Sequence, residues 1–246
     1  MLIRLGTIQK LVRYPVKSMA GISTESAVLG WHGLQGDRRL AFRRVGNTSS
    51  FPWLNASKLA EMVLYQPLGI DEREEEPIPT HVRTPEGNVL PLDSPQLRSL
   101  LENKFGGPIE LMKLKNGIFD DASVSVISTA TIATVSKDVG DHLDVRRFRP
   151  NILIATDENE PFPENKWIGG RLFFGDDATG PVVSLTSRDL RCVMINIDPD
   201  SGEKDPRILT STARLNQSNA GAYGTVIRGG LLSVGQPVTL IIETRD

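Results

Sequence analysis

The stretch Arg146-Arg147-Phe148-Arg149-Pro150-Asn151-Ile152-Leu153-Ile154-Ala155 joins a basic turn to a short apolar run. A proline ends the turn, and the run after it has the length and composition of a buried strand. The same pattern recurs along all 246 residues, in which 22 glycines and 16 prolines separate short β-rich runs. This punctuation predicts a mainly β chain with few helices, an α+β fold whose sheet is strongly bent or barrel-like.

The expected elements follow from local patterns. Strands are predicted over residues 3–12, 25–29, 39–45, 62–66, 81–84, 89–92, 152–155, 172–174, 182–185, 192–197, 223–227 and 238–242. Ser94 followed by Pro95 is typical of a helix N-terminus, and Ser128 or Thr129 is suited to cap a second helix. A boundary without a change in composition, between residues 117 and 122, divides the chain into two β-rich halves, 1–118 and 119–246.

Composition and motifs exclude several classes of protein. With 28 basic and 30 acidic side chains the net charge is −2, which argues against general binding of nucleic acid or of a membrane surface. The apolar runs are too short to span a bilayer and the first residues lack a signal-peptide pattern, so we expect a cytoplasmic protein. The three histidines lack metal-ligand spacing, and no dinucleotide fingerprint, P-loop or nucleophile elbow occurs.

One cysteine, Cys192, is the whole thiol content of the chain. A single thiol excludes a disulfide, a multi-thiolate zinc site or a protein-ligated iron–sulfur cluster within one chain. Arg188 and Arg191 precede it, and nearby cations favour the thiolate that a nucleophile or metal ligand needs. The alternative is a small buried residue without chemistry.

Three basic segments are candidates for binding an anion. Lys17-Ser18 follows a predicted strand end and offers an ammonium and a hydroxyl to a phosphate. The turn Gly36-Asp37-Arg38 adds a guanidinium, and the segment from Arg146 to Asn151 adds three more. For each segment, a solvated surface turn is the alternative interpretation.

Taken in order, these segments and three further ones resemble the two-domain MOSC proteins, the molybdenum cofactor sulfurase C-terminal domain family with an N-terminal β-barrel partner. Their nearest functional relatives are the mitochondrial amidoxime-reducing component and its bacterial counterparts. The segments that support the resemblance are Tyr14-Pro15-Val16-Lys17-Ser18, Gly36-Asp37-Arg38, Arg147-Phe148-Arg149-Pro150-Asn151, Arg191-Cys192, Asp198-Pro199-Asp200-Ser201-Gly202 and Ser233-Val234-Gly235. The chain departs from relatives of the amidoxime-reducing type at Asp189-Leu190, where they often have small or sulfur-containing residues.

The resemblance implies an N-terminal β-rich domain over 1–118, a C-terminal MOSC β-barrel over 119–246, and molybdenum cofactor in the cleft between them. In such relatives the residue matching Cys192 ligates molybdenum. The residues implied to hold the pterin and its phosphate are those matching Lys17, Ser18, Arg38, Ser128, Arg149 and Asn151. Because a pterin dithiolene brings two sulfurs of its own, one protein thiolate is enough to complete the sulfur ligands.

The function that the resemblance implies is reduction of N-hydroxylated compounds by a molybdenum oxidoreductase. Electrons are expected from a separate redox protein, such as a ferredoxin, a flavodoxin or a cytochrome b5-like protein with its reductase. A small N-hydroxylated substrate is the other expected partner, with no nucleic acid and no membrane. Two alternatives stay open. One is sulfur transfer through a persulfide on Cys192, as in the domain fused to pyridoxal-phosphate sulfurases, and the other is a non-catalytic molybdopterin-binding protein.

Overall fold

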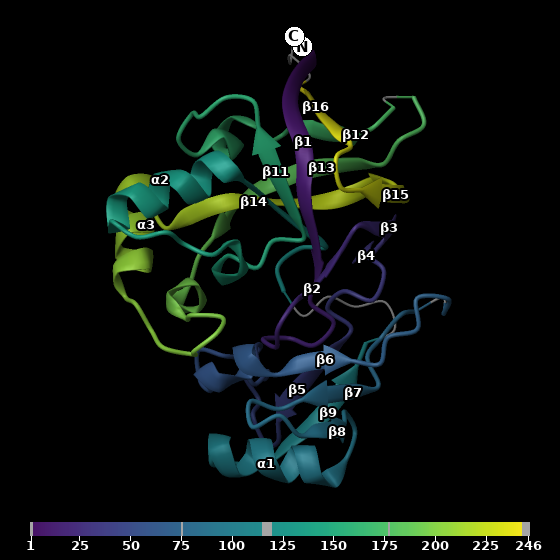
Figure 1. Ribbon diagram of the computed structural model, residues 1–246, viewed down its shortest axis with the longest axis vertical. Coiled ribbons are helices and arrows are strands. Elements are labelled where there is room, and N and C mark those ends of the chain that lie inside the picture. Colours follow the sequence, from purple (N-terminus) through teal and green to yellow (C-terminus); the bar gives the residue numbers. More distant parts are fainter. Residues whose placement is uncertain (1, 75, 115–119, 177, 243–246) are drawn as a thin grey trace.

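A closed barrel of seven strands forms the larger part of the computed structural model, which describes residues 2–74, 76–114, 120–176 and 178–242. Around the barrel the strands follow one another in the order β1 (Leu2–Arg13), β11 (Ile152–Thr156), β10 (Val124–Ser128), β14 (Asn219–Arg228), β13 (Val182–Leu190), β12 (Arg171–Phe174) and β16 (Pro237–Ile241). Only β10 and β11 run parallel, and β1 closes the barrel by pairing with both β11 and β16. The predicted mainly β fold is thereby confirmed (Figure 1).

Two small additions flank the barrel. Strand β2 (Ile22–Thr24) pairs with the end of β1, and β15 (Gly230–Ser233), β3 (Ser26–Gly30) and β4 (Gly33–Leu34) form a three-stranded sheet. Helices α2 (Thr129–Val139) and α3 (Arg207–Asn216) pack together against the barrel on its other side (Figure 1).

The lower part of the molecule in Figure 1 has its own sheets and its own core. Strand β5 (Leu40–Arg44) pairs with β9 (Ile109–Lys113), and β6 (Gln66–Leu68), β7 (His81–Arg83) and β8 (Val89–Pro91) form a second sheet. Helix α1 (Pro95–Phe105) buries Leu97 and Leu101 against them. This core is separate from the one that fills the barrel.

The two helices expected from the sequence begin at the predicted caps. The Ser94 hydroxyl accepts the Leu97 N–H at 3.2 Å, and the Ser128 hydroxyl accepts the Thr131 N–H at 3.0 Å. Each bond satisfies one of the N–H groups that the first helical turn leaves without a partner.

The barrel contains strands from both sides of the domain boundary that the sequence predicts at residue 118. Strand β1 lies in the same closed sheet as the strands after residue 123, and β3 pairs with β15. Residues of the first half are thus part of the second half's sheets, while the boundary itself stays a prediction.

Two predicted strands are wrong, and several elements were not predicted. Residues 62–66 fall mostly in a 3-10 helix, Ala60–Leu64, and residues 192–197 in another, Val193–Asn196. In the second case the Asn196 side chain accepts a hydrogen bond from the Leu209 N–H of α3 at 2.9 Å. This segment is therefore tied to a helix and does not pair with a neighbouring strand. The predicted set omits, among others, strands β2, β4, β9, β10 and β15 and helix α3.

Candidate functional site: a cation-lined cavity beside a thiol

A cavity of about 370 Å³ lies between the barrel and the lower part of the molecule. Segments far apart in the sequence line it, among them the segment after β1, the turn before β5, the turn before β11 and the end of β13. Of the seven residues that the resemblance implies for the cofactor site, the structure brings five to this cavity: Lys17, Ser18, Arg38, Arg149 and Cys192.

Three of these five residues have backbone strain in common. Ser18, Arg38 and Arg149 all adopt positive φ, at 67°, 48° and 50° respectively. Non-glycine residues rarely enter this left-handed region, and where they do the surrounding structure must hold them there. Strain of this kind is concentrated at functional sites, and this cavity has three of the six such residues in the described structure, which makes it the candidate site.

Arg38 is a buried guanidinium fixed from behind by Asn151. Its Nη1 donates to the Asn151 Oδ1 at 2.7 Å and also to the Asp37 carboxylate. Asn151 is fully buried, and it accepts the Ser125 N–H at 3.1 Å and donates to the Val12 carbonyl at 3.1 Å. Asn151 therefore orients Arg38 and does not itself line the cavity.

The Asp120 carboxylate shows where two of the cations converge. Lys17 forms an ion pair with it, and the Arg38 Nε donates to its Oδ2 at 2.7 Å. Burial alone would raise the pKa of Asp120, but Arg38 and Lys17 bring it well below the usual range. Burial lowers the pKa of Lys17 in spite of Asp120. Two donors that hold one internal carboxylate are arranged to hold an anion.

Arg149 is the cation of this cavity without a compensating charge. Its guanidinium lies over the Tyr14 ring, 4.2 Å from the centroid, and its Nη1 donates to the Met19 carbonyl at 2.8 Å. Within the described ranges no carboxylate forms an ion pair with it, and burial lowers its pKa. Burial also raises the pKa of Tyr14 to about 12, and its hydroxyl has no hydrogen-bond partner among the described residues.

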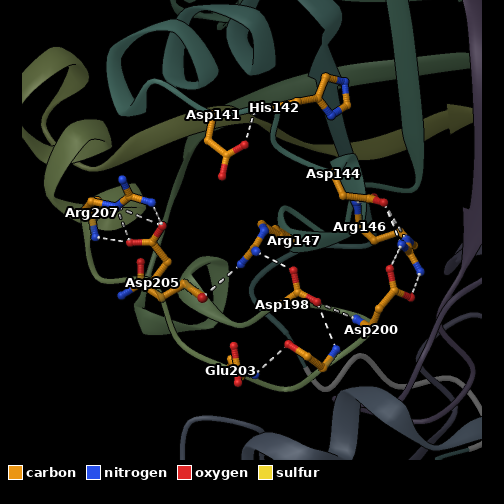
Figure 2. A network of polar contacts seen from close by, with 12 residues as sticks. Asp141, His142, Asp144, Arg146, Arg147, Asp198, Asp200, Glu203, Asp205 and Arg207 are labelled. Atoms are coloured by element: carbon orange, nitrogen blue, oxygen red, sulfur yellow. Dashed lines mark hydrogen bonds and ion pairs between the residues drawn. The ribbon is translucent and has the colours of Figure 1, made fainter.

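The other two arginines of the predicted basic turn are neutralised by acids (Figure 2). Arg146 donates to Asp144 at 2.9 Å and to Asp200 at 2.8 Å, and Arg147 donates to Asp198 at 2.6 Å. The three guanidiniums predicted to form one anion site thus have different roles. Arg146 and Arg147 tie their turn to the segment after Cys192, and only Arg149 keeps its charge available to the cavity.

Ser128 does not lie at this cavity. Besides capping α2, its backbone N–H donates to Glu164 Oε1 at 2.6 Å, and the residue is fully buried. A contact between Ser128 and a cofactor, implied by the resemblance, has no counterpart in this geometry, because the hydroxyl is used within the helix N-terminus.

Cys192 is exposed, directly before the second 3-10 helix, and it lines the cavity. The cations that precede it point elsewhere. Arg188 donates to Gln217 at 3.3 Å, and Arg191 donates to the Phe148 and Ala220 carbonyls at 2.6 and 2.7 Å. No group of three or more His, Cys, Asp or Glu residues suited to a metal occurs in the part of the chain that the structure describes. A metal at Cys192 would take its other ligands from elsewhere.

Among the lining residues that were not proposed as site residues from the sequence are four polar ones: Tyr14, Asp120, Ser125 and Tyr223. Tyr14 lies inside the quoted motif next to Lys17, so proximity to a candidate was the available signal for it. Asp120, Ser125 and Tyr223 had no such signal, since their roles depend on the tertiary arrangement.

A β-barrel with a strained, cation-lined cavity beside one exposed thiol defines the class of this protein. The chain matches the MOSC domain family over residues 111–239 and the MOSC N-terminal beta barrel domain over residues 5–51. It belongs to the MOSC domain family.

Similar proteins fall into two groups. The chain is 28% identical over 128 residues to "Mitochondrial amidoxime-reducing component 1" of Danio rerio, and 28% identical over 137 residues to "Mitochondrial amidoxime reducing component 2" of Rattus norvegicus. These regions cover 48% and 50% of this chain but only 37% and 38% of the relatives, so the chain spans less than two fifths of their length. The YUAD protein of Bacillus subtilis has a similar fold, with a TM-score of 0.51 and 13% identity over 98% of this chain and 96% of that one.

None of the helices in the described ranges is both long and apolar enough to span a membrane.

Proposed function

We propose that this cavity binds the molybdenum cofactor and that the chain reduces N–O bonds of N-hydroxylated compounds. The observation that supports this most is the convergence of Lys17, Arg38 and Arg149 on the cavity that Cys192 also lines. Membership of the MOSC domain family and similarity to proteins named amidoxime-reducing components support the same proposal.

The residues present fit such a cofactor on three grounds. A terminal phosphate needs cations, and Arg149 is a partly buried guanidinium without a carboxylate ion pair among the described residues. A pterin offers polar ring edges, and the Tyr14 hydroxyl is buried without a hydrogen-bond partner in the described structure. A metal that brings two dithiolene sulfurs needs one more soft ligand, and Cys192 is an exposed thiol. The cavity volume is in the usual range of ligand sites, about 300–1,000 Å³.

Each residue has a distinct task in this proposal. Lys17, Ser18, Arg38 and Arg149 would hold the phosphate and pterin, and Cys192 would ligate the metal. When bound, the cofactor would supply two-electron redox chemistry at molybdenum. Asn151 keeps the Arg38 fork in one orientation through its 2.7 Å bond. Arg191 fixes the backbone next to Cys192 by bonding to two carbonyls across the chain.

The electrons would come from a separate redox protein, for which a ferredoxin, a flavodoxin or a cytochrome b5-like protein with its reductase is suited. Such carriers bind transiently and through complementary charge. Turnover with a reduced viologen dye, and with a carrier and its reductase, but not with NADH alone, is the expected pattern.

The test of the proposal is the molybdenum and pterin content of protein purified from a host that makes the cofactor. We expect close to one molybdenum and one pterin per chain, and reduction of benzamidoxime when a reduced viologen dye is supplied. Protein from that host without molybdenum would contradict the proposal.

Sulfur transfer is the second candidate, because the Cys192 thiol is exposed and accessible to an acceptor. It requires a persulfide on Cys192, which cyanide releases as thiocyanate in an amount that can be measured. Thiocyanate release from metal-free protein would favour this candidate. Bound molybdenum without turnover of any N-hydroxylated compound would favour a non-catalytic cofactor-binding protein.

A further inference from the structure

Asp189 is a buried carboxylate at the wall of the cavity. It lies near the end of β13, where its neighbours Arg188 and Leu190 are exposed, yet Asp189 itself is only 1% exposed. The side chain thus points inward from a strand end that otherwise faces solvent, and it lines the same cavity as Cys192.

The two oxygens of this carboxylate have different surroundings. Oδ2 accepts the Ser125 hydroxyl at 3.0 Å and forms an ion pair with the Arg191 Nη2 at 2.7 Å. Oδ1 has no hydrogen-bond partner among the described residues. Arg191 Nη2 faces Oδ2 as an ion pair without the geometry of a hydrogen bond, and its Nε and Nη1, bonded to the Ala220 and Phe148 carbonyls, hold the guanidinium in that place. The Tyr223 hydroxyl is the other donor beside the carboxylate, and it lowers the pKa of Asp189. Buried polar atoms in native proteins are nearly always hydrogen-bonded, so Oδ1 is an acceptor suited to a donor from a bound molecule.

The position of Asp189 favours the substrate as that molecule over the cofactor. Three cations of the cavity are suited to a phosphate. Lys17 follows β1, Arg38 precedes β5, and Arg149 lies in the turn before β11. Asp189 instead lies three residues before Cys192, on the segment that presents the exposed Leu190 to the cavity. A substrate has to reach the metal that Cys192 would hold, and this segment is the one it would meet there.

The charges around Asp189 keep it an acceptor at neutral pH. Burial raises its pKa to about 6, while Arg191, Ser125, Tyr223 and Arg38 act in the opposite direction. The carboxylate is therefore mostly ionised above pH 7. An ionised carboxylate has only acceptor sites and requires an N–H or O–H from its ligand.

We propose that Asp189 Oδ1 accepts a hydrogen bond from the substrate, so that the cavity selects N-hydroxylated compounds with an N–H or O–H donor beside the N–O bond. Amidoximes and hydroxylamines have this donor, and N-oxides such as pyridine N-oxide lack it. This inference rests on the proposed function. A site built to bond an N–H or O–H discriminates strongly against an analogue without one, because the buried acceptor is then left unpaired.

The test measures binding in the absence of an electron donor, so that no turnover occurs. Benzamidoxime and pyridine N-oxide are titrated by calorimetry into cofactor-loaded wild-type protein, Asp189→Asn and Asp189→Leu. Asp157→Asn is the matched control, since Asp157 is an exposed carboxylate that does not line the cavity. Molybdenum content and melting temperature of each variant are measured on the same samples.

We expect Asp189→Leu to weaken benzamidoxime binding by about 10-fold to 100-fold, the loss typical of a hydrogen bond to a charged group. Pyridine N-oxide should bind with unchanged or higher affinity, and Asp157→Asn should match the wild type. Asp189→Asn keeps the size of the side chain and one oxygen acceptor but loses the charge, so if the leucine variant unfolds it should weaken benzamidoxime binding in the same direction and by less, again without weakening pyridine N-oxide. Equal changes for both ligands, or none, would overturn the inference.

The remaining outcomes separate this inference from the function on which it rests. If the Asp189 variants lose molybdenum in proportion to benzamidoxime binding, Asp189 holds the cofactor and the inference is wrong while the proposed function stands. If the wild-type protein contains no molybdenum, both fall.

Discussion

Replacing Arg149 with methionine removes a partly buried charge that the fold alone does not require. The side chain makes one hydrogen bond, to the Met19 carbonyl, and one contact with the face of Tyr14. A hydrogen bond from a charged donor contributes about 1.5–3 kcal/mol, and a cation–π contact about 0.5–2 kcal/mol. Against them stands a desolvation cost of several kcal/mol for a buried ion. Burial lowers the pKa of Arg149, so the folded protein holds this charge less well than water does.

The opposing contributions nearly cancel, so Arg149→Met should change the free energy of unfolding of the cofactor-free protein by no more than about 1 kcal/mol. Asn151→Ala is the contrasting variant, because it removes one hydrogen bond from Arg38 and takes the side-chain partner away from the Ser125 N–H and the Val12 carbonyl. It should cost about 3 kcal/mol or more, at about 1–3 kcal/mol for each buried group left unsatisfied. Arg146→Met is the matched control, a partly exposed arginine whose ion pairs contribute about 0–1 kcal/mol.

Denaturant unfolding of protein made without the cofactor, and molybdenum content of protein made with it, provide the two measurements. We expect Arg149→Met to keep its stability and to lose about tenfold or more in cofactor affinity, as for the loss of one charge-assisted phosphate contact. Arg146→Met should keep its molybdenum. If Arg149→Met destabilises the cofactor-free protein as much as Asn151→Ala does, Arg149 is a structural residue and the reasoning fails.

Three further predictions concern stability and domain structure. The pKa of Asp189 is raised to about 6, against about 3.9 in an unfolded chain, so ionisation of this carboxyl opposes folding. The free energy of unfolding of the wild type, relative to that of Asp189→Asn, should therefore fall by roughly 2–3 kcal/mol as the pH rises from about 4 to about 7. Parallel pH profiles of the two free energies would argue against this. Ser128→Ala should lower the free energy of unfolding by about 1 kcal/mol, because the cap of α2 is lost, and should leave the molybdenum content unchanged. A loss of molybdenum would instead support the cofactor contact that the resemblance implied for Ser128. The fragment 119–246 lacks β1, which closes the barrel, so it should show no cooperative unfolding by circular dichroism, whereas a cooperative transition would mean that it folds alone.

Most of the fold was predictable because its signals are local. The short apolar runs between glycines and prolines mark six of the seven barrel strands, all but β10, and Ser94 and Ser128 mark where two helices begin. The segment after Cys192 was predicted wrongly because its apolar residues suit a strand. In the structure it is a 3-10 helix whose Asn196 side chain accepts a hydrogen bond from α3. Local patterns do not contain such long-range partners.

The candidate site was predictable in its members and not in its assembly. Lys17, Arg38, Arg149 and Cys192 come from separate segments, and no spacing in the sequence brings them to one cavity. The positive φ of Arg38 and Arg149 is equally hidden, because the usual signal for that conformation is glycine. Which arginine of the basic turn stays available to a ligand depends on carboxylates some 50 residues away.

The central claim is that Cys192 and this cavity hold molybdenum, and X-ray absorption at the molybdenum edge tests it most directly. The measurement compares wild-type protein with Cys192→Ser, both purified from a host that makes the cofactor. A serine hydroxyl is too hard a ligand to replace a thiolate, so the account predicts one sulfur ligand fewer at molybdenum in the variant, with an unchanged melting temperature of the cofactor-free protein because the residue is exposed. The same number of sulfur ligands in both proteins, or no molybdenum in either, would contradict it.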